Sequence, residues 1–346
     1  MFKYLRYFCS IVAGHVLRRD IPILVTLCVT HRCNMRCIYC YGHFYDRKEP
    51  DMSTEDILRL IDEMAAAGTR YISLNGGEAL LRDDIGVIVD RIRSKGILCH
   101  LSTNGLLIRN RIDVLRKIDS LAVSIDGVGR ENDLNRGQGT YARILDGLSF
   151  LREQGIHFHT HTVITRHNAG ALEAILGLAE KFGSRAQFSL CRVADSPSKD
   201  IGLGDEQLKC VVHNILELKR LGRPVFFSGQ AYETYLSWPF SYDVIKVDEK
   251  STPSFPSAPP CYVKRFSCHI EPDGAVYPCI VLSGKGPALN ARKSGFAEVW
   301  RQVTKSPCRA CYNICCNDLN HIFSLNFDSI RNACGVVLGR FLPVKK

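Results

Sequence analysis

The sequence predicts an α/β fold of six βα units followed by a small cysteine-rich region. Short β-branched apolar runs alternate with helical-period stretches of about 10 to 15 residues from Ile23 to about Gly222, a pattern typical of a parallel sheet. Eight of the sixteen cysteines lie between Cys261 and Cys334, where periodic structure is scarce. Six units are too few for a complete eight-unit barrel, so we expect a partial barrel or an open sheet with its chemistry at the carboxyl edge.

The expected strands are apolar runs that each end in polar or glycine residues, where a loop would begin. They span residues 23–30, 71–75, 97–103, 120–125, 157–164 and 186–193. The expected helices follow them at helical spacing, over residues 53–67, 84–95, 109–118, 140–154, 169–182 and 205–221. The first of these helices opens with Ser53 and Asp56, which form a weak capping box.

The chain is expected to divide into four segments. Residues 1–21 form an amphipathic helix, 22–222 the βα units, 223–260 a connecting region and 261–346 the cysteine-rich domain. Residues 251–260 hold four prolines in ten positions, which is typical of a linker or an extended crossing segment.

The amino-terminal helix has an apolar stripe flanked by basic residues. The stripe consists of Phe2, Leu5, Phe8, Ile11 or Val12, and Val16, and the flanking residues are Lys3, Arg6, Arg18 and Arg19. An amphipathic stripe usually packs on a core, so the favoured interpretation is a helix beneath the sheet. The alternative is a basic interfacial helix that touches a membrane surface.

Composition excludes several classes of protein. With 346 residues, 46% hydrophobic and 23% charged, the chain is neither a small disulfide scaffold nor a membrane-spanning protein. Its 45 basic and 35 acidic residues give a net charge of +10, but they are interleaved, so no nucleic-acid partner is expected. Sixteen cysteines without a secretory signal indicate metal ligands in a reducing cytoplasm.

The strongest motif is a C-x3-C-x2-C run directly after the first expected strand. It is formed by Cys33, Cys37 and Cys40. Three thiolates from one tight loop can hold three irons of a [4Fe-4S] cluster and leave the fourth iron open to a ligand that is not protein. The alternative is a zinc knuckle, which would need a fourth ligand from elsewhere in the chain.

At these residues the sequence resembles the radical S-adenosylmethionine (radical SAM) family, whose signature also has an aromatic residue before the last cysteine, here Tyr39. The resemblance implies a partial (βα)6 TIM-like barrel. It also implies that SAM chelates the open iron, and that reduction of the cluster cleaves SAM to a 5′-deoxyadenosyl radical that abstracts hydrogen. Asp126 through Tyr141 further resembles a stretch of the anaerobic sulfatase-maturing enzymes and their peptide-modifying relatives.

Further motifs fall at the ends of successive expected strands. Adjacent glycines in Asn75-Gly76-Gly77-Glu78 would let the backbone approach a ligand closely, and Glu78 offers an acceptor. The resemblance implies a set of SAM-binding residues, namely Gly76, Gly77, Glu78, Ser102, Asn104, Ser124, Asp126, Arg136, Thr162 and Arg192.

The second cysteine set resembles the auxiliary-cluster extension called SPASM and its shortened form, twitch. Its members are Cys261-x17-Cys279 and Cys308-x2-Cys311, which would supply the four thiolates of one closed auxiliary [4Fe-4S] cluster. A full SPASM region holds two clusters, but the later cysteines here have altered spacing, so one cluster is expected. Further ligands, or a hydrogen-atom donor, could come from Cys268, Cys315, Cys316 and Cys334. A zinc ribbon is the alternative for this set.

Some candidates remain without an assigned role. His157, His159 and His161 alternate on one face of the fifth strand, and no metal is assigned to them. The five remaining cysteines are expected to pack as small apolar residues, namely Cys9, Cys28, Cys99, Cys191 and Cys210. No catalytic acid or base is singled out among Asp133, Tyr141, His159 and Glu233.

We expect a cytoplasmic radical SAM enzyme, membrane-associated if the amino-terminal helix binds lipid. A small-molecule or lipid-precursor substrate is favoured, and a peptide substrate is the alternative. An acidic electron donor such as flavodoxin or ferredoxin would suit the net charge of +10. The competing hypothesis is a non-catalytic iron–sulfur electron-transfer protein or zinc-binding module.

Overall fold

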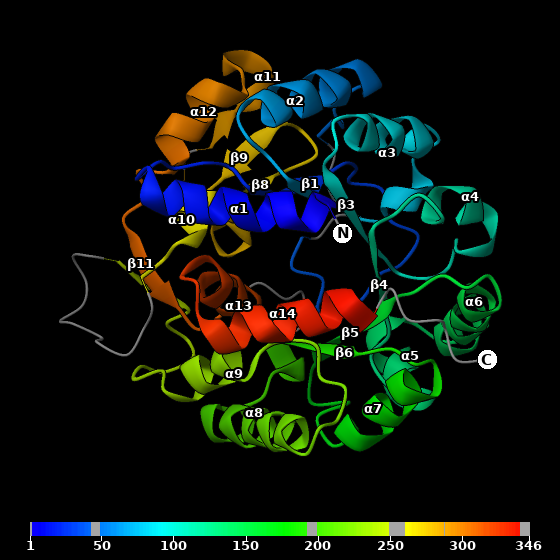
Figure 1. Ribbon diagram of the computed structural model, residues 1–346. Coiled ribbons are helices and arrows are strands. Elements are labelled where there is room, and N and C mark those ends of the chain that lie inside the picture. The colour runs from blue at the N-terminus through cyan, green and yellow to red at the C-terminus, as the bar shows by residue number, and fades with distance from the viewer. Residues whose placement is uncertain (1, 43–48, 192–198, 249–259, 287, 340–346) are drawn as a thin grey trace.

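The computed structural model describes residues 2–42, 49–191, 199–248, 260–286 and 288–339. Its main element is a nine-stranded sheet (Figure 1). The strand order is β10-β9-β8-β1-β2-β3-β4-β5-β6. The six strands from β1 to the edge strand β6 are parallel and confirm the predicted ones: β1 (Leu24–Cys28), β2 (Tyr71–Asn75), β3 (Leu98–Thr103), β4 (Ser120–Ser124), β5 (His159–Ile164) and β6 (Ala186–Leu190).

The cysteine-rich region continues this sheet. Strand β8 (Ser267–Ile270) pairs in parallel with β1, with Leu24 opposite Ser267 and Leu27 opposite Ile270. Strands β9 (Ala275–Tyr277) and β10 (Leu289–Asn290) follow antiparallel, and β7 (Lys246–Asp248) pairs with β11 (Cys308–Cys311) in a second small sheet. Sequence analysis did not predict that the two regions share one sheet.

The helices between the strands cover the outer face of the sheet. They are α2 (Thr54–Ala66), α3 (Ile85–Ser94), α4 (Ile112–Leu115), α5 (Arg130–Arg136), α6 (Thr140–Glu153), α7 (Leu172–Lys181) and α8 (Asp205–Arg220). Helix α2 begins as the capping box predicts, because the Ser53 hydroxyl accepts a hydrogen bond from Asp56 N at 3.1 Å. The polar α5 has no apolar period and was not predicted.

The segment 223–260 contains regular structure. Helix α9 (Gly229–Leu236) buries Tyr232 and Tyr235 and packs against α8 and α13 (Ile314–Phe323). The proline-rich stretch expected as a linker falls almost entirely at 249–259, outside the described residues. The remaining helices of the carboxy-terminal part are α10 (Val263–Phe266), α11 (Ala291–Ser294) and α12 (Phe296–Val303).

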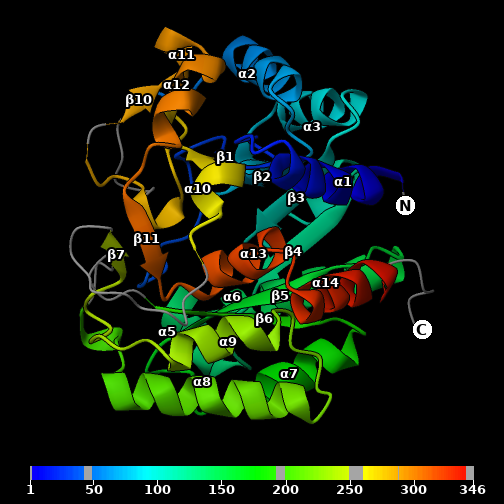
Figure 2. The same ribbon diagram turned by 60° about the vertical axis from the view of Figure 1, so that its left-hand side comes forward.

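Helices α1 (Phe2–Val16) and α14 (Phe327–Gly339) lie on the same side of the molecule, at the amino ends of the strands (Figures 1 and 2). Lys3 forms an ion pair with Asp119 at 3.0 Å, directly before β4, and the ring of Tyr7 contacts Tyr71 at the start of β2. The carboxyl ends of the strands therefore open on the opposite side. No helix among the described residues is long and apolar enough to cross a bilayer.

Candidate active site

The loop that carries the first cysteine motif is fixed where it leaves β1. Asp51 accepts hydrogen bonds from the Thr30 hydroxyl and from His31 N, the latter at 2.8 Å. At the far end, Ile38 N donates to Asn135 O at 3.1 Å, which ties the loop to α5. The loop is thus held from two elements before any ligand binds.

The three thiols of this loop are half-buried, and Cys40 lies near both Cys33 and Cys37. Burial, Glu78 and the nearby Cys40 raise the pKa of Cys33. The pKa of Cys37 rises to about 11, mainly through burial and despite the Arg136 charge, with Cys40 and Cys33 among the further causes. Three soft ligands from one loop suit an iron–sulfur cluster, and binding it would release protons from these thiols.

Gly76 and Gly77 press the end of β2 onto this loop. A Cβ atom at Gly76 would lie 2.5 Å from Thr30 O, and one at Gly77 would lie 2.3 Å from Arg32 O. Hydrogen bonds from Gly77 N to Thr30 O and from Glu78 N to Arg32 O, at 2.8 and 2.9 Å, hold the contact. The close approach expected toward a ligand is therefore made toward the cysteine loop itself.

Glu78 joins the ends of β2 and β3. Its carboxylate is 1% exposed and accepts hydrogen bonds from Asn104 N at 2.7 Å, the Thr103 hydroxyl at 3.0 Å and Leu80 N at 3.1 Å. Burial raises the pKa of Glu78, and these bonds oppose the shift. Asn104 in turn donates to Asn34 Oδ1 at 2.7 Å, between Cys33 and Cys37. Glu78 and Asn104 position the cysteine loop.

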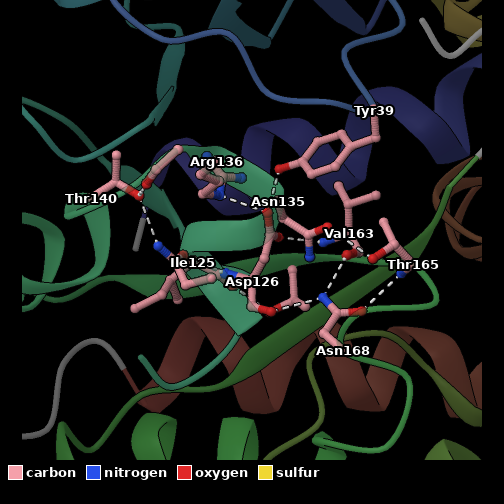
Figure 3. Close-up of polar contacts among 12 residues, drawn as sticks. Tyr39, Ile125, Asp126, Asn135, Arg136, Thr140, Val163, Thr165 and Asn168 are labelled. Carbon is pink, nitrogen blue, oxygen red and sulfur yellow. Dashed lines mark hydrogen bonds and ion pairs between the residues drawn. The ribbon is translucent and has the colours of Figure 1, made fainter. Parts of the chain in front are cut away.

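A buried ion pair lies beside Cys37 (Figure 3). Arg136 Nε is 2.7 Å from Asp126 Oδ2, which also accepts a hydrogen bond from the Tyr39 hydroxyl, while Asp126 Oδ1 accepts from Val163 N at 2.8 Å. Burial disfavours the charge of Arg136, but Asp126, Tyr39 and Cys37 outweigh it and hold the pKa of Arg136 above its usual value. A fixed positive charge therefore faces the cysteine loop.

Asn135 is a residue that sequence analysis missed. It is fully buried, its Oδ1 accepts from the Thr165 hydroxyl at 2.9 Å, and its Nδ2 has no hydrogen-bond partner among the described residues (Figure 3). An unsatisfied buried donor costs free energy, so this amide suits a polar ligand at the cysteine loop. Its position directly before the Arg136-Gly137 motif was the available signal.

The inner face of the barrel is polar. His100 contacts the hydroxyls of Ser120 and Ser102 at 2.9 and 3.2 Å, and His161 contacts the Ser189 hydroxyl at 2.9 Å. Pairing of adjacent strands places further half-buried polar residues on this face: Thr26, Ser73, Asn75, Ser124 and Gln187. Branched apolar residues normally fill this space in a barrel, whereas short polar residues and imidazoles occupy these positions here.

Burial of His161 predicts a pH dependence of stability. Desolvation, and secondarily the Arg136 charge, lowers the pKa of His161 to about 4, from an ordinary value of 6.5. Between these two pH values His161 is protonated in the unfolded chain but not in the folded chain. The free energy of unfolding therefore falls as pH drops from about 6.5 toward 4. His161 is half-buried and not fully buried, so solvent reduces the effect, and we expect it to contribute about 2 kcal/mol to the pH dependence of the unfolding free energy. His161→Asn should remove this contribution. Urea unfolding of both proteins across this range measures it, and a constant difference between them contradicts it.

Other predicted SAM contacts have different surroundings. Thr162 faces away from the inner face, and its hydroxyl donates to Ile125 O at 2.6 Å. Ser124 and Ser102 lie on the inner face, as their strand pairing requires. Arg192 lies outside the described residues.

The catalytic candidates have structural partners. Asp133 accepts hydrogen bonds from Gly139 N and Tyr141 N at 2.7 and 2.8 Å, which shapes the turn into α6. Glu233 pairs with Arg220 on the exposed surface, and His159 stacks on Phe226. None of these contacts reaches the cysteine loop.

A buried His269–Glu271 pair was not predicted. His269 Nε2 lies 3.1 Å from Glu271 Oε1 and 3.8 Å from the Cys28 thiol, next to the carboxyl end of β1. No sequence motif marks these residues. The pairing of β8 with β1 alone brings them to this edge.

The second cysteine set comes together around β11 and the start of α13. Cys261 is hydrogen-bonded to Cys308, a contact that lowers the pKa of Cys261 to about 7. Cys316 is hydrogen-bonded to both Cys279 and Cys311. Within the described residues, no three His, Cys, Asp or Glu side chains form a group suited to a single metal ion.

The further cysteines have distinct surroundings. Burial, with Asp318, Cys311 and Cys279 nearby, raises the pKa of Cys315 to about 12. Cys268 lies in the apolar core beside Val25, and Cys334 is exposed on α14.

Comparison with known families identifies both regions. The model of the radical SAM superfamily matches residues 27–179, and that of the SPASM iron–sulfur cluster-binding domain matches residues 261–312. The two domains imply [4Fe-4S] clusters and SAM as cofactors.

Curated relatives are enzymes with different names. Fe-coproporphyrin III synthase of Methanosarcina barkeri is 34% identical over 175 residues, 49% of this chain and 44% of the relative. Mycofactocin maturase MftC of Mycobacterium ulcerans is 30% identical over 178 residues, which are 50% of this chain and 48% of the relative. The matched part of the chain thus spans about half the length of these relatives. An AdoMet-dependent heme synthase of M. barkeri is 27% identical over 82% of this chain and 83% of its own length.

Solved structures share the fold. SuiB of Streptococcus suis bound to S-adenosylmethionine superposes with a TM-score of 0.64 at 16% identity, over 84% of this chain and 68% of SuiB. The structure of anSMEcpe with bound AdoMet superposes with a TM-score of 0.63 at 17% identity, over 90% of this chain and 98% of anSMEcpe. The chain therefore contains a radical SAM domain, built as a partial (βα)6 barrel, and a C-terminal SPASM domain.

Proposed function

We propose that the enzyme abstracts hydrogen from a small molecule or a lipid precursor whose polar part binds inside the barrel. The polar inner face is the observation that carries this proposal: the strands β1 to β6 present hydroxyl, amide and imidazole groups where a filled barrel has apolar ones. His161 is neutral at neutral pH, so it offers hydrogen bonds without charge.

Cys33, Cys37 and Cys40 would hold the catalytic [4Fe-4S] cluster. When bound, the cluster and SAM supply the electron and the 5′-deoxyadenosyl radical of this superfamily. The chain's own residues orient them: Glu78 and Asn104 fix the loop, and Arg136 places a positive charge beside Cys37. Asn135 and the predicted contacts Gly76, Gly77 and Asp126 contact the same loop, whereas Ser102 and Ser124 lie on the inner face of the barrel.

Cys261, Cys279, Cys308 and Cys311 would hold one auxiliary [4Fe-4S] cluster. Cys316 contacts Cys279 and Cys311 and is therefore a candidate for a further ligand. Cys268 lies in the apolar core and Cys334 is exposed on α14, away from these cysteines. An acidic reductant such as flavodoxin or ferredoxin would be attracted by the net charge of +10. We place the enzyme in the cytoplasm.

A peptide substrate is the second candidate. MftC is named as a maturase, and SuiB is known with its precursor peptide SuiA. The resemblance of residues 126–141 to peptide-modifying relatives favours it, whereas the heme synthases favour a small molecule.

Deuterium transfer distinguishes the two substrate classes. An extract of cells grown in deuterated medium is separated into aqueous small-molecule, lipid and peptide fractions. Each fraction is then incubated with the reconstituted enzyme, dithionite and SAM. We expect 5′-deoxyadenosine to gain deuterium from the small-molecule or lipid fraction, and transfer from the peptide fraction alone would overturn the proposal.

Substitution at Ser189 tests where the substrate binds. Ser189→Leu fills the inner face, so we expect deuterium transfer to fall by about tenfold or more while uncoupled SAM cleavage persists. Ser189→Ala keeps the space open and serves as the matched control. Equal transfer by both variants would place the substrate elsewhere.

A further inference from the structure

The solvent-facing side of α1 is apolar throughout. All of its exposed residues are apolar, namely Phe2, Leu5, Phe8, Cys9 and Val16, and Phe2 and Val16 are 70% and 75% exposed. The opposite side of the helix, with Ile11 and Gly14, packs on the protein. A helix that is apolar on both sides requires a second apolar surface to cover it.

Helix α14 also has exposed apolar residues. It lies on the same side of the molecule as α1 (Figures 1 and 2), with Phe327 76% and Leu338 53% exposed. Its exposed charges, Asp328 and Arg331, neutralise each other at 3.1 Å. Two helices therefore present apolar side chains at one end of the barrel.

Unpaired arginines border this surface. Among the described residues, Arg6, Arg18, Arg19 and Arg70 form no ion pair with a carboxylate. Partial burial, and secondarily the nearby Arg6 charge, lowers the pKa of Arg70. The nearby carboxylates are already engaged, because Asp20 pairs with Arg265 and Asp119 with Lys3. The border is therefore complementary to anions.

A hollow of about 470 Å³ lies between α1, the segment 17–21 that follows it and residues 67–70 after α2. Ser10, Ala13, Leu17, Arg19 and Arg70 are among its lining residues. Asp20 also lines the hollow, but its carboxylate is paired with Arg265 at 2.7 Å. Two guanidinium groups and a hydroxyl beside an apolar wall therefore match a phosphate headgroup and the first part of its acyl chains.

We propose that the face formed by α1 and α14 docks on an anionic phospholipid surface. Its apolar side chains enter the boundary of the acyl chains, and Arg19 and Arg70 contact a phosphate headgroup. The cysteine loop opens at the opposite ends of the strands, so docking leaves the active site facing away from the lipid. This inference does not depend on the proposed substrate.

Vesicle sedimentation of the reconstituted enzyme tests the docking. We expect binding to vesicles of phosphatidylcholine mixed with phosphatidylglycerol, weakened by salt, and little binding to phosphatidylcholine alone. Combined replacement of Phe2, Leu5 and Phe8 by serine should weaken binding on the order of a hundredfold. Arg19→Glu with Arg70→Glu should weaken it by about twentyfold or more.

Two matched variants control for surface changes as such. Val87→Ser removes a 52% exposed apolar residue on α3, and Arg301→Glu reverses an exposed charge on α12. Both should bind as the parent does, and all variants should keep uncoupled SAM cleavage. Equal binding to both vesicle types, or unaltered binding by the docking variants, would overturn the proposal. A dimer in sedimentation velocity that the serine variant loses would assign the face to a second copy of the chain instead.

Discussion

Alanine at Cys33, Cys37 and Cys40 together is expected to reduce 5′-deoxyadenosine formation to the level of a protein-free control. The three half-buried thiols come from one loop whose sequence contains no further cysteine, so we expect the triple variant to lose the whole catalytic cluster. After anaerobic reconstitution the parent should hold about eight irons per chain and the variant about four, for two clusters and one. Iron analysis, and EPR with and without SAM, measure the change.

The matched control removes thiols of the other set. Cys261→Ala with Cys308→Ala should lose about four irons but keep the SAM-dependent change of the EPR signal. A triple variant that still forms deoxyadenosine would show that these cysteines do not hold the catalytic cluster. About twelve irons in the parent would instead establish a second auxiliary cluster.

The second large effect is expected from Asp126→Ala. The substitution leaves the buried Arg136 guanidinium without its carboxylate and removes the acceptor of Val163 N and of the Tyr39 hydroxyl. Breaking a buried ion pair in this way costs about 3 to 5 kcal/mol of unfolding free energy. SAM binding should weaken as well, since Arg136 and Tyr39 lie beside Cys37.

Denaturant unfolding and a SAM titration measure these effects. Asp146→Ala is the control, because it breaks the Arg109–Asp146 pair at 2.7 Å, whose side chains are 49% and 56% exposed. Solvent screens an exposed pair, so this variant should unfold nearly as the parent does. Similar losses in both variants would contradict a structural role for the buried pair.

Local patterns account for the parts of the fold that were predicted. Strand β2 occupies Tyr71–Asn75 as expected, because its apolar residues are bounded by clear turn signals. The helix α5 was missed, since its seven residues are held by tertiary contacts and not by an apolar period. The exit of β1 also differs: the strand ends at Cys28, and the residues that follow turn toward Asp51.

The candidate site divides in the same way. The spacing of Cys33, Cys37 and Cys40 is a local signal and could be read directly. Several of the bonds that make Glu78 and Asp126 positioning residues join parts of the chain that are 25 to 87 residues apart, so no spacing rule reveals them. The His269–Glu271 pair depends on a strand pairing more than 240 residues apart, which only the folded chain displays.

The pairing of β8 with β1 also bears on how the chain reaches its native state. Strand β1 is synthesised early, yet one of its two edges has no neighbour until residues 267–270 have emerged. An open edge of a buried parallel strand is a template for pairing with other chains, and distant pairings form slowly. We therefore expect that a protein cut before Cys261 would aggregate instead of yielding a free barrel, and that the iron–sulfur region serves the nascent chain as the partner that closes this edge.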